Sequence, residues 1–424
     1  MRRLIILFLF AIPFLIFISC KKDPIGQNTG DAEWIKVISD TPARLPGKIR
    51  PDQDNNLYCS YNYTDYKADS SSALIKLDKN GKLIWRKEFT HFTIYDFLIT
   101  DENRILMVSY SNGMITLTMD TNNVMFGSYP LRIISGDFRD LLGVKLFKNS
   151  AGNYMISGTV FYRKDGERVS MAFLIEINKE DGQKSWMQHY DFPAGPEITV
   201  TGCAEVDDES GYILIGSIQE KVPLISSFFL LRVNEFGDSL WTKVHETSSY
   251  TSTGPDSGTY HGYYCFTSDI ISSADNNFYA CAYNQKYNLP NINGLPAYSD
   301  DDNSARILKI NADGEVIDYE RLKHDFQNMA ADLVLTTDGG LLIGFNPIRL
   351  VGTFYVGKQS SFIARLNPDL TVQSVSFIQN HYYDYLGSLC AMPDGHYAIQ
   401  TMIQSFGNDH FYLEIIKTNK NGNF

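Results

Sequence analysis

The sequence predicts an all-β fold, a seven-bladed β-propeller built from four-stranded antiparallel blades. Three observations support this prediction: a hairpin signal that occurs seven times after residue 30, a second strand-turn-strand signal that alternates with it, and termini that complement each other. No stretch after the apolar leader shows the sustained periodicity of an amphipathic helix. Two β-sandwiches are the alternative, but they give no reason for complementary termini.

The first signal is a turn rich in Asp, Asn and Gly that leads into an apolar run. These residues accept the positive φ of a tight hairpin turn, so each signal predicts a pair of inner strands. The spacing of roughly 50 to 65 residues suits a four-stranded blade with generous loops. The seven runs end at Tyr61, Tyr110, Gly158, Gly216, Tyr283, Phe345 and Thr401.

The second signal is a strand, a turn and another strand with a large residue at a fixed place. Its three strong copies place a glycine four residues before a tryptophan, giving the pairs Gly81 and Trp85, Gly182 and Trp186, and Gly237 and Trp241. Weaker copies end at Phe126, Asp318 and Ser374. We expect the tryptophans on the outer strands, filling the widening gap between blades, where an aromatic side chain buries the most area.

Trp34 predicts how the ring closes. The C-terminal segment that ends at Phe424 has the strand and Asn-Gly turn of the second signal but lacks its outer strand. The N-terminal segment supplies that strand, with Gly30 four residues before Trp34. We therefore expect the N-terminal strand to complete the last blade, which removes open sheet edges.

Residues 1–19 have the pattern of a signal peptide, with Arg2 and Arg3 followed by an apolar run too short for the roughly 20 residues of a membrane-spanning helix. Their junction with Cys20 resembles the lipobox of bacterial lipoproteins, although Phe17 replaces the usual Leu. The resemblance implies cleavage before Cys20, acylation of Cys20 (with palmitate among the acyl groups), a tether over 20–30 and a single propeller domain over 31–424. The expected location is extracytoplasmic, in the bacterial cell envelope, with the membrane contacted through the lipid. An uncleaved anchor and plain secretion remain alternatives.

The charge balance argues against nucleic acid as a partner. The chain has 49 Asp and Glu against 37 Lys and Arg, a net charge of -12, whereas binding to phosphate backbones needs clustered cations. The cysteines after Cys20 show no CxxC spacing, which excludes zinc knuckles. Cys59 and Cys281 lie inside apolar runs, and we interpret them as small buried hydrophobic residues.

The repeat with Asp78, Gly81 and Trp85, and its copy with Asn178, Gly182 and Trp186, resembles the tryptophan-docking repeat of quinoprotein dehydrogenases and related propeller lipoproteins. The resemblance implies the architecture of residues 30–424. It does not extend to the quinone chemistry, because that family generally has eight blades and adjacent cysteines at its cofactor site. We expect no cofactor.

The candidate ligand face is the one formed by the connections between blades and by the loops between the second and third strands. Asp96, Asp269 and Asp332 each stand five or six residues before an inner hairpin turn, which predicts a place near the mouth of the central channel. Metal or sugar binding is one interpretation; aspartates that hold backbone N–H groups are the other. No metal ligand set and no catalytic residue is predicted. The further candidates for this face are Asp140, His324, His381, Tyr95 and Tyr383.

The longest insertion runs over 285–304 in the fifth unit and contains the consecutive carboxylates Asp300, Asp301 and Asp302. These residues lack the alternation of an EF-hand, so calcium is a weaker interpretation than a solvated acidic loop.

Two functional classes remain open from the sequence. The first is a lipid-anchored binding or interaction module for a glycan, peptide or envelope protein. The second is a hydrolase or lyase that acts on an extracellular polymer through Asp and His residues at the channel mouth. The first is preferred. No residue pair has the local spacing of a nucleophile and its base, but catalytic triads are assembled in space, so convergence of several acids and histidines at one channel mouth is what would favour the enzyme.

Overall fold

The computed structural model describes residues 32–38, 45–64, 70–111, 114–119, 124–130, 138–164, 166–191, 197–206, 210–219, 226–245, 260–289, 297–298, 304–322, 328–347, 360–378, 383–404 and 411–424. The predicted signal peptide, Cys20 and tether lie outside these residues. Among the residues described, no helix has the length and apolar character needed to span a membrane.

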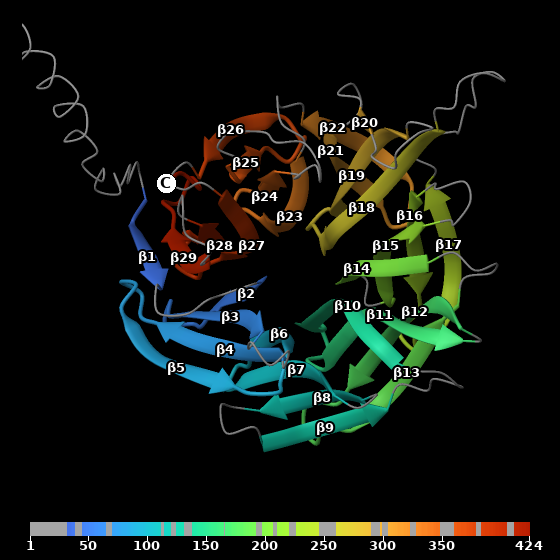
Figure 1. Ribbon diagram of the computed structural model, residues 1–424, viewed down its shortest axis with the longest axis horizontal. Coiled ribbons are helices and arrows are strands. Elements are labelled where there is room, and N and C mark those ends of the chain that lie inside the picture. The colour runs from blue at the N-terminus through green and yellow to red at the C-terminus, as the bar shows by residue number, and fades with distance from the viewer. Residues whose placement is uncertain are drawn as a thin grey trace, which may run out of the picture.

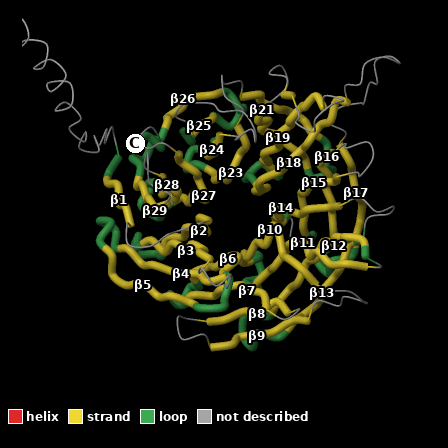
Figure 2. The backbone as a smooth tube through the Cα atoms, in the orientation of Figure 1, coloured by secondary structure: helices red, strands yellow, loops and turns green. Residues whose placement is uncertain are grey.

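The described strands form seven antiparallel sheets around a common axis, which confirms the predicted propeller (Figure 1). Figure 2 shows the described chain entirely as strands and loops. In each blade the innermost strand is called A and the outermost strand D.

The first four blades follow the chain order. Blade 1 contains β2 (Leu45–Pro51), β3 (Leu57–Thr64), β4 (Ser70–Leu77) and β5 (Leu83–Phe89). Blade 2 contains β6 (Ile94–Ile99), β7 (Ile105–Ser111), β8 (Met114–Met119) and β9 (Val124–Pro130). Blade 3 contains β10 (Phe138–Lys148), β11 (Tyr154–Lys164), β12 (Glu167–Ile177) and β13 (Lys184–Tyr190). Blade 4 contains β14 (Glu197–Glu205), β15 (Tyr212–Gln219), β16 (Ser226–Val233) and β17 (Ser239–His245).

The last three blades complete the ring. Blade 5 contains β18 (Tyr260–Ser272), β19 (Asn277–Leu289), β21 (Ser304–Asn311) and β22 (Val316–Leu322), with the short β20 (Ala297–Tyr298) paired to β19. Blade 6 contains β23 (Asn328–Leu335), β24 (Leu341–Pro347), β25 (Phe362–Leu366) and β26 (Val372–Phe377). Blade 7 contains β27 (Tyr383–Ala391), β28 (Tyr397–Gln404), β29 (Phe411–Lys417) and β1 (Trp34–Ile38).

The long insertion in blade 5 is not wholly a loop. Its first residues, from Gln285 to Leu289, continue β19, and Tyr287 and Asn288 pair with β20. The backbone hydrogen bonds of the extended hairpin therefore continue into the insertion. Asp300, Asp301 and Asp302 lie outside the described residues.

The hydrophobic core lies between neighbouring blades. Strand β15 is almost continuously buried, as expected for a sheet covered on both faces. One apolar cluster joins Met155 and Leu174 of blade 3 to Leu214 and Phe229 of blade 4. Each blade is thus stabilised mainly by the two blades beside it.

Most of the described turns between strands C and D share one hydrogen-bond pattern. In blades 1, 3, 4, 5 and 7 the first turn residue is Asp or Asn, and its side-chain oxygen accepts backbone N–H groups further along the turn; in blade 6 the acceptor is Asp369. Asp78 Oδ1 accepts from Asn80 N at 2.9 Å and from Lys82 N at 2.8 Å, and Asn234 Oδ1 accepts from Phe236 N at 3.0 Å. The turn glycines Gly81, Gly182, Gly237 and Gly314 have positive φ. This pattern explains why the second signal recurs in the sequence.

The tryptophans lie on D strands and are half-buried, as predicted. Trp34, Trp186 and Trp241 contact a glycine of the next blade, whereas Trp85 meets Tyr58 of its own blade edge to face, with 5.9 Å between ring centroids. A Cβ added to Gly81 in blade 1 would lie 2.8 Å from the Trp34 ring of blade 7. A Cβ on Gly237 would lie 2.6 Å from Trp186, and one on Gly314 would lie 2.2 Å from Trp241. A glycine is therefore required where each of these rings is received. In blade 2, Met125 pairs with Thr118 and so takes the place that Trp85 has in blade 1, opposite Lys76. The sequence pattern had assigned this place to Phe126, one residue further on.

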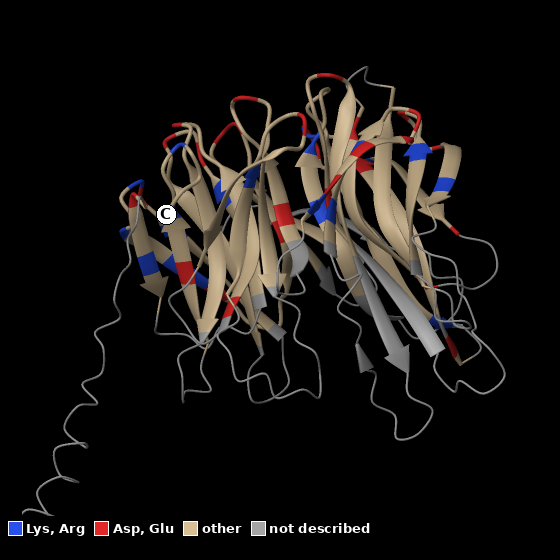
Figure 3. Cartoon of the chain, turned by 90° about the horizontal axis from the view of Figure 1, so that it is seen from above, with Lys and Arg blue, Asp and Glu red and all other residues tan. Residues whose placement is uncertain are grey.

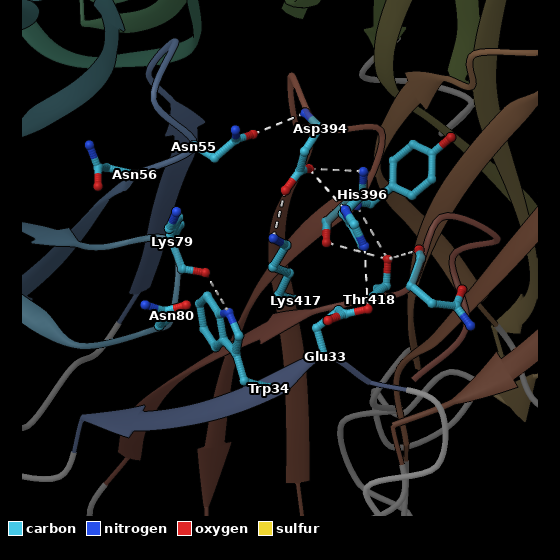
Figure 4. A network of polar contacts seen from close by, with 12 residues as sticks. Glu33, Trp34, Asn55, Asn56, Lys79, Asn80, Asp394, His396, Lys417 and Thr418 are labelled. Carbon is cyan, nitrogen blue, oxygen red and sulfur yellow. Dashed lines mark hydrogen bonds and ion pairs between the residues drawn. The ribbon is translucent and has the colours of Figure 1, made fainter.

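The ring closes as the termini predicted. Strand β1 pairs antiparallel with β29, and Trp34 lies opposite Lys417. Around this seam Lys417 Nζ lies 2.7 Å from Asp394 Oδ2, and His396 lies between Asp394 and Glu33, with Nδ1 3.0 Å from Asp394 Oδ1 and Nε2 3.3 Å from Glu33 Oε1 (Figure 4). The seam therefore joins both ends of the chain through backbone and charged groups.

The N-terminal strand begins on the side of the A-B and C-D turns. Glu33 N donates to Lys417 O at 3.0 Å, and the Glu33 carboxylate faces His396, which ends the A-B turn of blade 7. Many of the described Asp and Glu residues gather at the turns on this side (Figure 3). The chain therefore enters the propeller at an acidic face.

Candidate functional site

Every A strand contains a β-bulge at the same height. The register shifts after Pro46 in β2, Ile94 in β6, Leu142 in β10, Val200 in β14, Thr267 in β18, Ala330 in β23 and Leu386 in β27. The residue three positions before each strand end therefore falls into one layer around the axis, called here the axial layer. Its members are Lys48, Asp96, Lys145, Gly202, Asp269, Asp332 and Ser388.

Two of the predicted aspartates tie neighbouring blades together. Asp96 is fully buried, and its Oδ2 accepts Leu146 N of blade 3 at 2.8 Å while its Oδ1 accepts Phe97 N at 2.8 Å. Asp332 makes the same contact to blade 7, where its Oδ2 accepts Leu389 N at 2.9 Å and the Ser388 hydroxyl at 2.8 Å. Both carboxylates thus satisfy backbone N–H groups that the bulges leave outside the β-ladders.

The third aspartate, Asp269, forms an ion pair between two blades that are not neighbours, with blade 4 between them. Lys145 Nζ of blade 3 lies 2.6 Å from Asp269 Oδ1 of blade 5. Blade 4 contributes Gly202 at this height, and a Cβ there would lie 2.6 Å from the same oxygen. Burial raises the pKa of Asp269, and the Lys145 ammonium opposes that shift. The missing side chain of Gly202 is what lets the two charges meet.

Blade 1 contributes two cations near these carboxylates, Lys48 in the axial layer and Arg50 two residues after it. Arg50 Nη2 lies 3.2 Å from Asp96 Oδ1. Burial lowers the pKa of Lys48, but the carboxylates of Asp332 and Asp96 outweigh it and raise that pKa above its ordinary value. Three cations and three carboxylates therefore balance one another among the described residues around the axis.

Solvent reaches the innermost strands three residues before the axial layer, whereas Asp96, Asp332 and Ser388 in the layer itself are buried. Tyr385 on β27 is 44% exposed and Leu142 on β10 is 41% exposed, although both stand on innermost strands. Neighbouring blades cover the two faces of these strands, and the B strand covers one edge, so solvent reaches them along the axis. Thr201 Oγ1 and Thr267 Oγ1, 2.6 Å apart, join blades 4 and 5 close to the layer.

The structure brings together three of the sequence-predicted candidates, Asp96, Asp269 and Asp332. Tyr95 is partly buried and packs against the apolar cluster of blades 2 and 3. Asp140 lies on β10 and Tyr383 on β27, and only their backbone is described. His324 and His381 lie outside the described residues. The described residues contain no group of three or more His, Cys, Asp or Glu side chains placed to hold a metal ion.

Sequence reasoning missed Lys48, Arg50 and Lys145, because a single lysine or arginine within a strand belongs to no recognisable motif. The sequence did contain a signal for Lys48 and Lys145. Each stands at the same distance before its A-B turn as Asp96, Asp269 and Asp332 do. The four described cysteines, Cys59, Cys203, Cys281 and Cys390, are buried and free, which confirms the interpretation of Cys59 and Cys281.

No protein-family model and no curated protein matches the chain. Solved structures do resemble it. The polysaccharide lyase Uly1 gives a TM-score of 0.53 at 9% identity, covering 90% of this chain and 91% of that chain. A PL25 ulvan lyase bound to -[GlcA(1-4)Rha3S]- gives a TM-score of 0.53 at 9% identity, covering 91% and 97%. The Cps50 (Swd1) β-propeller domain of Myceliophteria thermophila gives 0.47 at 9% identity, covering 90% and 98%. At this identity the likeness shows the propeller fold alone.

Proposed function

We propose that this chain is an extracytoplasmic binding module of the bacterial cell envelope, anchored through a lipidated Cys20, whose propeller binds a glycan, a peptide or an envelope protein. The observation that supports this proposal is that the carboxylates of Asp96, Asp269 and Asp332 already have partners within the protein. Their carboxylates are occupied by backbone N–H groups and cations, so the described part of the axis offers a polar binding surface rather than a free acid and base.

The position of β1 supports the direction in which the module faces. A tether from Cys20 to Trp34 reaches at most about 50 Å at roughly 3.5 Å per residue. It joins the propeller at the acidic A-B and C-D turns. The opposite face, with the connections between blades, is then directed away from the lipid and is free to meet a ligand.

A hydrolase or lyase acting on an extracellular polymer is the second candidate. The observation that favours it is the shared fold with two polysaccharide lyases over about nine tenths of each chain. Propellers host both binding and catalysis, so this likeness alone does not choose between them.

The test is a pull-down of glycans and envelope proteins with soluble residues 21–424, which include every described residue. Retention of one defined component with no change in its chain length supports the binding module. Shortening of a polymer, with a new ultraviolet-absorbing double bond for a lyase, would support the enzyme instead. A Cys20→Ser variant of the full chain should lose its partition into detergent, and unchanged partition would contradict the lipid anchor.

A further inference from the structure

His396 stands between two carboxylates that come from different parts of the chain (Figure 4). Its Nε2 lies 3.3 Å from Glu33 Oε1, and its Nδ1 lies 3.0 Å from Asp394 Oδ1. Glu33 directly precedes β1, the strand that closes the ring, whereas Asp394 belongs to the A-B turn of blade 7. The imidazole therefore links the start of the closing strand to the body of its blade.

The protonation state of this imidazole decides how strong the link is. A neutral imidazole has one N–H group, so it donates toward one carboxylate only and presents a lone pair to the other. An imidazolium has N–H groups on both nitrogens and a positive charge that attracts both carboxylates. The His396 side chain is 16% exposed, so solvent screens these interactions only in part. Protonation therefore strengthens the contacts of both nitrogens.

The other charged groups around the imidazole already have partners or face solvent. Lys417 of β29, a cation that opposes protonation, has its Nζ 2.7 Å from Asp394 Oδ2. From blade 6, Arg365 Nη2 lies 2.8 Å from Asp338 Oδ2, and Arg365 Nη1 donates to Lys420 O at 3.3 Å. The Lys420 side chain is exposed, so solvent and salt screen its charge. These cations are thus neutralised or screened, and the charge of the imidazolium is left to act on the carboxylate that precedes β1.

Glu33 depends on His396 for an opposite charge. Within the ranges that the structure describes, the Glu33 carboxylate makes no other ion pair or side-chain hydrogen bond, and half of its side chain is exposed. Burial raises the pKa of Asp394, but hydrogen bonds from Lys417 and His396 outweigh burial and hold that pKa below its ordinary value, so Asp394 stays ionised. Blade 1 approaches with a neutral amide, since Asn55 Oδ1 accepts Asp394 N at 3.0 Å. Loss of the imidazole proton therefore releases Glu33, while the pair of Asp394 with Lys417 remains.

We infer that His396 is a pH-sensitive switch for ring closure: its protonated imidazole holds Glu33 and the start of β1 in place, and its neutral form lets β1 separate more readily from β29. Histidine side chains ordinarily change charge between about pH 5 and about pH 8. Because the attached strand favours the protonated form, its attachment is strongest in acid and weakens as the pH rises through this range. The switch acts where the chain enters the propeller, and it is independent of the ligand and the lipid anchor proposed above.

The test is hydrogen exchange of the full chain in detergent at low salt, measured by mass spectrometry on peptides that cover β1 and β26. Exchange rates are converted to protection factors, which removes the intrinsic effect of pH on exchange, and are compared at about pH 5.5 and about pH 8. Strand β26 is the outer strand of blade 6 and reports any pH effect that the whole propeller shares. The protection of β1 relative to β26 should be about threefold higher at the acid pH, as expected for a half-exposed ion pair.

Two variants remove the switch, and two matched variants control for them. Glu33→Gln removes the carboxylate and His396→Gln removes the titrating ring, so in both the relative protection of β1 should change by less than about 1.5-fold between the two pH values. Glu102→Gln changes an exposed glutamate in the A-B turn of blade 2. His245→Gln removes a histidine between blades 4 and 5, whose Nε2 lies 3.2 Å from Gly314 O. Both controls should keep the response of the wild type, and melting curves show that each variant is folded.

Three results would overturn the inference. The first is a wild-type protein in which the relative protection of β1 is unchanged or lower in acid. The second is a pH response that persists in Glu33→Gln or in His396→Gln. The third is a response that is lost equally in the two control variants. The pull-down tests the proposed function separately, because binding of an envelope component does not depend on how β1 responds to pH.

Discussion

Trp34 Nε1 donates to Lys79 O at 3.0 Å, although the two residues belong to blades at opposite ends of the chain (Figure 4). Trp34 lies on the outer strand of blade 7, and Lys79 lies in the C-D turn of blade 1. The same ring packs over Gly81. The closing seam therefore has a side-chain lock in addition to the backbone pairing of β1 with β29.

Replacing Trp34 with Ala should lower the free energy of unfolding by about 3 kcal/mol, because a half-buried indole and its hydrogen bond are lost. Urea denaturation measures this change. Trp34→Phe should recover most of the loss, since the ring remains. Trp85→Ala serves as the control, because Trp85 does not close the ring. If hydrogen exchange in β1 were no faster in Trp34→Ala than in Trp85→Ala, the lock would have no special role in closure.

Gly143 in the bulge of β10 should tolerate no side chain. Its φ is +63°, and an added Cβ would lie 1.6 Å from Val200 O of the next blade. We expect Gly143→Ala to destabilise the protein by about 3 kcal/mol or more, the sum of backbone strain and a clash with the main chain. Gly166 also has positive φ, at +85°, but nothing lies within 4 Å of its added Cβ, so Gly166→Ala should cost only about 1 kcal/mol. Equal melting temperatures for the two variants would contradict the close approach of blades 3 and 4.

Asp332→Asn should destabilise the fold by about 2–4 kcal/mol, because an amide has one acceptor oxygen where the carboxylate has two. If that oxygen accepts from Ser388 and Leu389, the amide NH2 group is left facing Leu333 N, which is also a donor. Chemical denaturation measures the loss. Asp54→Asn changes an exposed turn residue and should be nearly neutral. A fully stable Asp332→Asn variant would show that the carboxylate is not needed to join blades 6 and 7. Loss of binding in alanine variants of the three axial aspartates would report on folding as much as on a ligand.

The stability of blade 6 should fall in acid. A hydrogen bond from Thr336 and the ion pair with Arg365 hold the pKa of Asp338 at about 2, below its ordinary 3.8. Since the folded-state pKa is the lower one, this contribution is fully present above about pH 4 and is lost as the pH falls toward about 2. The difference in melting temperature between wild type and Arg365→Met should therefore shrink between about pH 5 and about pH 2. A constant difference over that range would exclude the ion pair as its cause.

The fold was predictable because each repeat can be recognised from a short stretch of its own sequence. The turn asparagines and glycines fix the hairpins through backbone geometry, and the C-terminal repeat without an outer strand indicates where the N-terminal strand must go. The sequence also placed Asp96, Asp269 and Asp332 in one region. It could not assign their contacts, because Leu146 and Leu389, which bind two of these carboxylates, lie in other blades.

Local spacing by itself determined the number of blades, the turns and the position of the tryptophans, because these depend on residues within one repeat. Only the tertiary structure decided which partners they meet. The sequence sets Gly81 four residues before Trp85, whereas in the folded ring Gly81 receives Trp34 from the blade beside it. The gathering of Lys48 with carboxylates of three blades is decided in the same way, because seven bulges at one height bring distant residues to a common axis.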